Sequence, residues 1–346
     1  MWKRTLAVRS PAKLMEPIKD PAEWHPDQLA DDHWIYTLND YEISEILAAV
    51  EDIENSGKDL SKTSIYEFRI PEFSSALNEI KAELTDGRGF ALIRGLPKAR
   101  MTNYQMAIAF WGIGNHIGFP KSQNKQGHLL GHVKDLGGDY SKVRGYLTQA
   151  AMGFHSDSAD ILSLGCIHPA KSGGQHRICS SVALYNQMLE KRPDLVEALT
   201  FRFYKIRKGE IPSGEKNPWI RQPIFSVTNG YFSARGPGSH LEKAQKLPGV
   251  PSLTELQKEA LDYFKLLAPK LAIDINFEPG DISFVYNHVT LHARTDFEDW
   301  PEDERKRHLL RLWLSTDCRP IHPDIAYVFR GVPVEGNADP TPLEAF

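Results

Sequence analysis

The sequence predicts an α+β protein with a mainly β core, in which one barrel-like set of strands is surrounded by helices. Three observations predict this fold class. Short strand-like runs separated by turns rich in Gly and Pro recur between residues 87 and 314. Helical patterns precede these runs and lie between them without a strict βαβ alternation. No glycine-rich nucleotide-binding fingerprint lies between a strand and a helix, which argues against a Rossmann fold.

The first part of the chain is predicted to be an extended arm followed by helices. Residues 1–35 contain four prolines and little periodicity, so we expect an arm that packs over the body. Apolar residues in steps of three and four predict the helices that follow. The elements expected after the arm are a helix over residues 40–50, a helix ending over 79–84, a turn and buried strand over 87–95, and a helix capped by Thr102 that runs through Trp111 and ends near Gly112 and Gly114.

The rest of the chain is predicted to consist mainly of strands. Asn229-Gly230, between two strand-forming runs, is typical of a type I′ hairpin, and residues 278–281 form a turn with Pro and Gly at preferred positions. The other expected elements are strands over residues 127–133, 161–167, 201–206, 282–286 and 307–314, a turn at 172–174, a helix over 183–190 capped by Ser181, and a helix from Thr254 to about Ala268.

Composition and charge limit the functional classes. With 346 residues, 41% of them hydrophobic, the chain can bury a large core. A net charge of −4 gives no general attraction to nucleic acid or to an anionic membrane. No apolar run approaches the roughly 20 residues that span a bilayer, and the N-terminus lacks the apolar segment of a secretory signal. Three widely spaced cysteines (Cys166, Cys179 and Cys318) form no disulfide framework or zinc motif, so we expect a reducing, cytoplasmic setting.

A His-x-Asp motif is the first candidate for chemistry. About one match is expected by chance, from 13 × 22/346 for the His and Asp counts, and the chain contains three. Two of them, His25-Pro-Asp27 and His322-Pro-Asp324, have a central proline and lie in terminal segments, which favours turns. The third, His155-Ser-Asp157, precedes the apolar run 161–167.

In a strand-like segment, His155 and Asp157 would project to the same face. A buried His–Asp pair or a fragment of a Ser-His-Asp hydrolase would also explain the motif. His292 follows a strong strand and a turn later in the chain. Two imidazoles and one carboxylate can hold one face of a ferrous ion and leave the other face open. If the three side chains meet, the sequence predicts an oxygen-activating iron site.

Alternation in the late strand places Arg307, Leu309, Arg311 and Trp313 on one face. Buried guanidinium groups are unfavourable unless each meets an anion. An acidic co-substrate would supply one, and the arginine fork binds carboxylates through two hydrogen bonds. The alternative is pairing within the protein, for example with Asp281 or Asp296.

Several motifs together resemble the TauD/TfdA family of Fe(II)- and 2-oxoglutarate-dependent oxygenases, over roughly residues 85 to 316. The residues that carry the resemblance are Phe154-His-Ser-Asp-Ser-Ala-Asp-Ile161, Ala170-Lys-Ser-Gly-Gly174, Glu278-Pro-Gly-Asp281, Asn287, Leu291-His-Ala-Arg294 and Arg307-His-Leu-Leu-Arg-Leu-Trp313.

The resemblance implies a double-stranded β-helix (a jelly-roll, cupin-like core) with flanking helices, in a single catalytic domain over residues 1–346. Residues 1–84 would form the arm and helices, residues 85–316 the oxygenase core, and residues 317–346 a C-terminal extension. Implied site residues are His155, Asp157 and His292 on iron, Arg307 on the distal carboxylate of 2-oxoglutarate, and Arg311 on an anionic group of the substrate.

One departure from the family pattern concerns 2-oxoglutarate. Taurine-type members have Gly-Gly-Asp-Thr, whose threonine helps to hold the co-substrate, whereas this chain has Gly173-Gly-Gln-His176. The hydroxyl of Ser180 or Ser181 could take that role, or no residue takes it.

The resemblance further implies that Fe(II), 2-oxoglutarate and O2 act on an unactivated C–H bond and that succinate and CO2 are released. Hydroxylation is the default outcome, with desaturation or ring closure as alternatives. We expect a small anionic or amino-acid-like substrate, in natural-product biosynthesis, with Arg235 and Asn287 as further contacts, Tyr146 and Trp313 near the pocket, and Arg294 bracing the His292 segment.

Other functions stay open at this stage. A taurine- or sulfonate-type catabolic dioxygenase is the nearest alternative, followed by a non-catalytic cupin-like binding protein and by a zinc or manganese enzyme that uses the same three side chains. A hydrolase is disfavoured because no G-x-S-x-G elbow follows a strand. Assembly into a homo-oligomer is not decided by the sequence.

Overall fold

The fold was analysed on a computed structural model, which describes residues 2–5, 7–29, 32–137, 148–207, 210–211, 214–316, 320–321 and 331–332. Tyr146, Cys318 and the motif at residues 322–324 lie outside these ranges. Among the described helices, none combines the length and the apolar composition that a membrane span requires.

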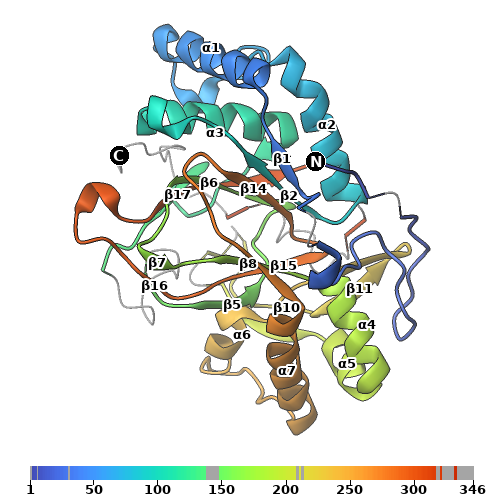
Figure 1. Cartoon of the computed structure of the whole chain (residues 1–346). Helices are drawn as coiled ribbons and strands as arrows, with labels where there is room; N and C mark the ends of the chain where they lie inside the picture. The colour runs from blue at the N-terminus through green and yellow to red at the C-terminus, as the bar shows by residue number, and fades with distance from the viewer. Residues whose placement is uncertain are drawn as a thin grey trace.

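Two sheets form the core and appear as stacked layers in Figure 1. The larger sheet has seven strands in the order β1-β2-β14-β6-β17-β3, with β4 also paired to β17. Its strands are β1 (Ile35–Thr37), β2 (Phe90–Arg94), β3 (Phe119–Pro120), β4 (Leu130–Val133), β6 (Ile161–His168), β14 (Ile282–Tyr286) and β17 (His308–Ser315).

The smaller sheet has four strands in the order β13-β8-β15-β5. They are β5 (Met152–His155), β8 (His176–Ser180), β13 (Ala272–Ile275) and β15 (Thr290–Arg294). Three two-stranded sheets complete the β structure: β7 (Ser172–Gly173) with β16 (Phe297–Glu298), β9 (Phe203–Ile206) with β10 (Trp219–Gln222), and β11 (Phe225–Thr228) with β12 (Tyr231–Ala234).

Helices cover the outer faces of both sheets (Figure 1). Helices α1 (Asp40–Ser56), α2 (Pro71–Asp86) and α3 (Asn103–Ile117) lie over the larger sheet. On the side of the smaller sheet lie α4 (Ser181–Lys191), α5 (Pro193–Thr200), α6 (Gly238–Ala244) and α7 (Glu255–Leu267). Short 3-10 helices are η1 (Pro26–Leu29), η2 (Leu60–Lys62), η3 (Lys98–Arg100), η5 (Ala268–Leu271) and η6 (Asp303–Arg305). The predicted fold class, a mainly β jelly-roll core with flanking helices, is confirmed.

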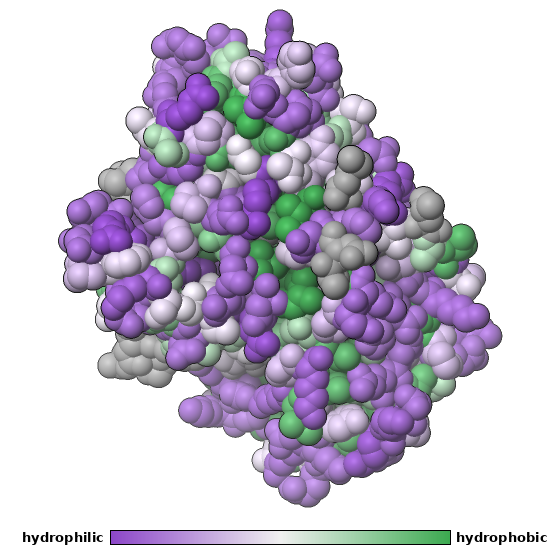
Figure 2. Space-filling model, viewed as in Figure 1, coloured by the Kyte–Doolittle hydropathy of each residue, from purple (hydrophilic) through white to green (hydrophobic). Residues whose placement is uncertain are grey.

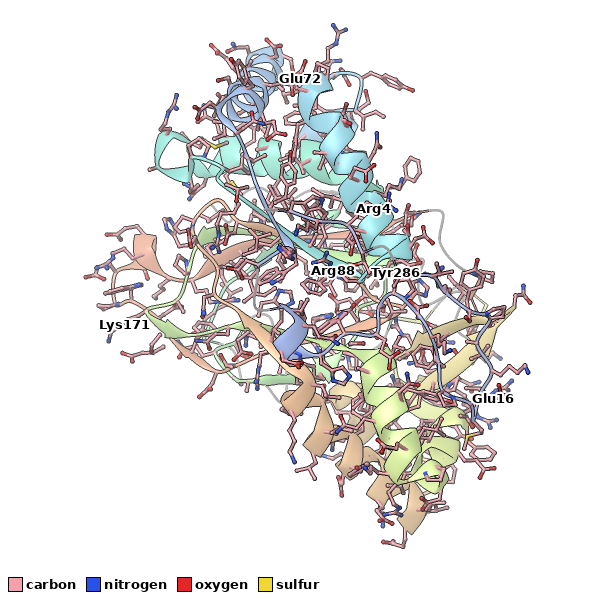
Figure 3. All side chains as sticks on the ribbon, turned by 45° about the vertical axis from the view of Figure 1, so that its right-hand side comes forward. Arg4, Glu16, Glu72, Arg88, Lys171 and Tyr286 are labelled. Atoms are coloured by element: carbon pink, nitrogen blue, oxygen red, sulfur yellow. The ribbon has the colours of Figure 1, made fainter. Side chains whose placement is uncertain are left out.

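Burial explains why the central strands are apolar almost without interruption. All five residues of β14 are buried, as are seven of the eight in β6, because helices cover one face and the second sheet covers the other. Figure 2 shows hydrophobic side chains gathered at the level of the sheets, while the helical layers present mostly hydrophilic surface. Figure 3 places Arg88 and Tyr286 in the interior and Glu72 and Lys171 on the periphery.

The N-terminal arm packs over the body, as the sequence predicts. Its backbone N–H groups form hydrogen bonds with distant parts of the chain. Thr5 N donates to Glu83 Oε2 at 2.8 Å, and Ala12 N donates to Gly230 O at 2.7 Å. Ile18 N donates to Asn186 Oδ1 at 2.8 Å. Figure 1 shows the arm as the dark blue trace that descends along the right-hand side.

Most predicted strands are confirmed within one to three residues. The hairpin is confirmed by its geometry as well, because Asn229 and Gly230 have φ values of 49° and 78°, as a type I′ turn requires. Two local predictions need correction. Ser180, not Ser181, caps α4 through a bond from Ala183 N. Residues 172–173 form the short strand β7, and the expected turn is limited to Gly173-Gly174, where both φ values are positive.

A third correction concerns the helix that starts at Thr102. It runs to Ile117 and does not end near Gly112 and Gly114. Both glycines face neighbouring elements: a Cβ at Gly112 would lie 2.3 Å from the Phe68 ring, and one at Gly114 would lie 2.4 Å from Leu312 Cδ1. These glycines therefore serve close packing, which outweighs their low helix propensity.

We expect Gly112→Ala to lower the free energy of unfolding by about 1–2 kcal/mol. The 2.3 Å approach to Phe68 places the overpacking cost in the upper part of its range, about 2–3 kcal/mol, and the helix gains only about 1 kcal/mol. Urea unfolding followed by circular dichroism measures this difference. Gly153→Ala is the matched control, since its Cβ would meet nothing within 4 Å. A Gly112→Ala protein as stable as the wild type would contradict the packing role.

Candidate metal centre and its cavity

Two facing strands position the histidines of the candidate metal centre. His155 is the last residue of β5, and β15 pairs with β5 so that His292 lies directly opposite His155. Asp157 lies two residues beyond the end of β5. Asp157 therefore reaches the two histidines from the segment after β5. We had expected it to lie within the same strand as His155.

The three side chains meet in space. Their ligand atoms all lie within 4.8 Å of one another, and this is the only such group of three found among the described residues. Nε2 of His155 is 3.8 Å from Oδ1 of Asp157, and Nε2 of His292 is 3.9 Å from Oδ2. The two imidazole centroids are 4.2 Å apart. Such a group can bind one face of a divalent ion.

Hydrogen bonds orient two of these groups, His155 and Asp157. His155 Nδ1 donates to Gly153 O at 2.8 Å, which leaves the lone pair on Nε2, the atom that faces Asp157. Trp313 Nε1 donates to Asp157 Oδ2 at 2.8 Å. From the sequence we expected Trp313 only near the pocket. Its bond to the carboxylate depends on the folded position of β17 next to the Asp157 segment.

Asn287 and Arg235 hold the backbone of the Asp157 segment. Asp157 N donates to Asn287 Oδ1 at 3.1 Å, and Arg235 Nη1 donates to Asp157 O at 2.8 Å. Asn287 also donates to Ala159 O at 2.9 Å. We expected both side chains to contact substrate; in the structure both bond to the protein backbone at or near Asp157.

The electrostatic environment suits a metal site. Burial, together with the neighbouring histidine, lowers the pKa of His292 well below its ordinary value, and burial also lowers the pKa of His155. Burial by itself would raise the pKa of Asp157, but His292, Arg311, His155 and the Trp313 bond together hold that pKa below its ordinary value. The set is therefore two neutral imidazoles and one carboxylate, the protonation states that a bound cation requires. The residues present fit a ferrous ion.

A cavity opens beside the three side chains, between the two sheets. Six apolar and seven polar or charged residues line it, so that several polar groups converge on one concave site, as at ligand sites. Its lining residues are Val133, Met152, His155, Asp157, Leu162, Leu164, His176, His292, Ala293, Arg294, Arg307, Leu309 and Arg311. Arg307, Leu309 and Arg311 all line it, as the alternation of the late strand predicts.

Arg307 is buried without an anion. Only 3% of its surface is exposed, Nη1 has no hydrogen-bond partner, and no carboxylate within the described part of the chain forms an ion pair with it. Burial and the neighbouring Arg294 lower its pKa to about 9. The guanidinium lies 5.1 Å from the Phe297 ring centroid. Its surroundings therefore favour binding of a negatively charged ligand.

Arg311 is fixed by a neutral partner. Its Nε donates to Gln123 Oε1 at 2.6 Å, and Gln123 Nε2 donates in turn to Arg311 O at 2.8 Å. Gly131 lies opposite Arg311 in β4, and a Cβ there would approach Gln123 Oε1 to 2.6 Å. The glycine thus makes room for the amide that orients the arginine.

Asp281, one of the acids considered for these arginines, pairs with Arg94 at 2.7 Å. Asp296 forms no ion pair with Arg307 among the described residues, and its carbonyl accepts from Gly174 N. Arg294 Nη2 donates to Thr148 O at 2.7 Å and to Ala150 O. It therefore connects β15 to the segment that leads into β5, consistent with the expected bracing role.

Neither Ser180 nor Ser181 lines the cavity. Ser180 Oγ donates to Ala22 O and caps α4, so the proposed replacement of the family threonine by these hydroxyls is wrong. His176, which the sequence analysis passed over, lines the cavity beside Arg307. Its position in the sequence could have identified it, because His176 stands where the Gly-Gly-Asp-Thr pattern has threonine.

A jelly-roll core with two histidines and one aspartate grouped at an inner cavity is the arrangement typical of non-haem iron oxygenases. A family model described as "Taurine catabolism dioxygenase TauD, TfdA family" matches residues 52–313. The chain belongs to this family, and it is an Fe(II)- and 2-oxoglutarate-dependent dioxygenase.

Known relatives agree with this placement. FR-33289 synthase from Streptomyces rubellomurinus is 30% identical over 320 residues, which cover 88% of this chain and 92% of that protein. The taurine hydroxylase-like protein SAT17 from Stachybotrys chartarum is 30% identical over 316 residues, covering 87% and 80%. Asparagine oxygenase, solved with Fe(II), 3-hydroxyasparagine and succinate, superposes with a TM-score of 0.63 at 16% identity and covers 81% of this chain and 93% of its own, which shows a shared fold.

Trp313→Phe is expected to weaken Fe(II) binding about 10- to 100-fold, because it removes a bond that orients a ligand carboxylate. Anaerobic titration of the purified protein with Fe(II) measures this affinity. Trp111→Phe is the matched control: Trp111 is also buried, but its indole N–H faces Thr63 O, remote from the centre. Equal Fe(II) affinity in the wild type and Trp313→Phe would argue against the orienting role.

Proposed function

We propose that His155, Asp157 and His292 hold the iron, that Arg307 pairs with the distal carboxylate of 2-oxoglutarate, and that the enzyme oxidises a C–H bond of a small anionic or amino-acid-like molecule. One observation carries this proposal. Three metal-ligand side chains with atoms within 4.8 Å of one another open onto the same cavity as a buried arginine that forms no ion pair with any described carboxylate.

Bound iron, with 2-oxoglutarate and O2, supplies the oxidising power for C–H cleavage, and succinate and CO2 are released. The protein's own residues orient and shield the reactants. Leu162, Leu164 and Leu309 line the cavity and limit the access of water. Trp313 and the backbone bonds to Asn287 and Arg235 keep the Asp157 carboxylate in place. The charge of Arg307 fixes one end of the co-substrate.

Arg311 supports an anionic group on the primary substrate. It lines the cavity close to the three ligands, and Gln123 and Trp313 fix its guanidinium group. A planar cation held in this way suits a carboxylate, sulfonate or phosphate oxygen. One relative is named a taurine hydroxylase-like protein, and asparagine oxygenase was solved with a hydroxylated amino acid. We therefore propose hydroxylation of an amino-acid-like compound in natural-product biosynthesis, with a sulfonate as the alternative substrate class.

Succinate release tests the function directly. Purified protein with Fe(II), 2-oxoglutarate and O2 is supplied with a panel of amino acids and sulfonates, and succinate formed in step with substrate consumption is expected for at least one class. His292→Ala should reduce this release to background because the triad is incomplete. His116→Ala, on the outer helix α3, is the control and should retain activity. Full turnover by His292→Ala would contradict the assigned site.

The two arginines are predicted to have separable roles. Arg307→Ala should raise the KM for 2-oxoglutarate about 10- to 100-fold, since a buried charge-assisted hydrogen bond contributes about 1.5–3 kcal/mol. Arg311→Ala should raise the KM for the primary substrate by a similar factor and leave the slow substrate-free consumption of 2-oxoglutarate nearly unchanged. Steady-state kinetics with each reactant varied in turn measures both effects. Parallel losses in the two variants would contradict the division.

A further inference from the structure

His176 is a buried polar residue that the family pattern does not account for. It is the first residue of strand β8 and lies opposite Arg294 of β15. Ile178, on the same face of β8, lies opposite His292. Because facing residues of antiparallel strands project to one side, the His176 ring lies inside the barrel. Its centroid is 5.9 Å from that of His292, with an interplanar angle of 80°.

The ring is held by stacking, but its two nitrogens have no hydrogen-bond partner among the described residues. Phe277 stacks on it, with centroids 5.7 Å apart and an interplanar angle of 19°. Only 3% of the residue is exposed, and neither Nδ1 nor Nε2 has a hydrogen-bond partner among the described residues. A buried polar group without a partner costs about 1–3 kcal/mol, so native proteins rarely keep one except where a ligand binds.

His176 is not a fourth metal ligand. The group of ligand atoms within 4.8 Å of one another contains His155, Asp157 and His292, and His176 falls outside it. Three arginines also line the cavity. Arg294 and Arg311 bond to other groups of the protein, whereas the charge of Arg307 is among the causes that lower the pKa of His176, after burial. The imidazole has an N–H to donate in either protonation state.

The turn before His176 lies against Arg307. A Cβ at Gly174 would approach Arg307 Nε to 3.1 Å and Phe297 Cβ to 3.2 Å, and the φ of Gly174 is +70°. The Gly173-Gly174 turn thus brings the start of β8 next to the guanidinium. An N–H donor and a guanidinium that share one cavity form a suitable site for a carboxylate, which has two oxygens to accept from both.

Resting on the proposed function, in which Arg307 pairs with 2-oxoglutarate, we propose that His176 donates a ring N–H hydrogen bond to the same distal carboxylate. The imidazole takes the place of the threonine hydroxyl in the family pattern. Arg307 supplies the charge, and His176 supplies the second, directional contact. The residue is thus a determinant of co-substrate specificity, for a 2-oxo acid that ends in a carboxylate.

Binding measurements without O2 test this role independently of turnover. The Fe(II)-loaded protein is titrated calorimetrically with 2-oxoglutarate and with 2-oxopentanoate, which has the same chain length but no distal carboxylate. His176→Phe keeps an aromatic ring against Phe277 and removes the N–H. It should bind 2-oxoglutarate about 10- to 100-fold more weakly and 2-oxopentanoate with unchanged affinity.

Two further variants complete the design. His176→Thr restores a hydroxyl donor at the family position and should recover most of the affinity for 2-oxoglutarate. His116→Phe makes the same substitution on α3, where His116 bonds to Phe68 O, and should bind both acids like the wild type.

The outcomes separate this inference from the function on which it rests. Unchanged 2-oxoglutarate affinity in His176→Phe, or an equal loss for both acids, would overturn the role of His176. If the wild type binds 2-oxoglutarate and Arg307→Ala weakens that binding while His176→Phe does not, only this inference fails. A wild-type protein that binds neither acid in the presence of Fe(II) would contradict the proposed function itself.

Discussion

The pairing of β5 with β15 is the constraint on which the rest of the site depends. It places His155 opposite His292 at the point where the register of the two strands shifts. The backbone of His155 is packed tightly there, since a Cβ at Gly236 would lie 2.6 Å from His155 Cα. Only with this pair fixed can the segment beyond β5 bring Asp157 to both imidazoles. Asp157 accepts bonds from Trp313 and Arg235 and donates its backbone N–H to Asn287, which prevents the carboxylate from moving away.

At Arg307 the interior holds a positive charge that no carboxylate among the described residues neutralises through an ion pair. This guanidinium has a lowered pKa of about 9 because it is buried near Arg294, and its Nη1 has no partner in the described structure. Such an arrangement is destabilising for the empty protein and favourable for an anionic ligand. Ligand binding offsets this destabilisation, because any ligand that binds only the folded state stabilises it.

The sequence predicted those features that local patterns control. Alternation in the late strand correctly placed Arg307 and Arg311 on the cavity side, and Asn229-Gly230 correctly predicted the hairpin. Features that depend on a distant neighbour were missed. Gly112 looked like a helix end because nothing in its local sequence reveals the Phe68 ring that packs against it. Likewise, Asn287 looked like a substrate contact, since its bond to Asp157 N joins residues 130 positions apart.

His176 shows how a departure from a family pattern can be explained by its surroundings. A threonine hydroxyl is short and turns freely about one bond, whereas an imidazole reaches further and must be held in one plane. Phe277 provides that plane by stacking on the ring, and the apolar setting keeps the ring neutral. A neutral ring adds no second charge beside Arg307, so the two groups can lie together in one cavity. The imidazole therefore replaces the hydroxyl as a directional donor, while the arginine alone provides the charge for the carboxylate.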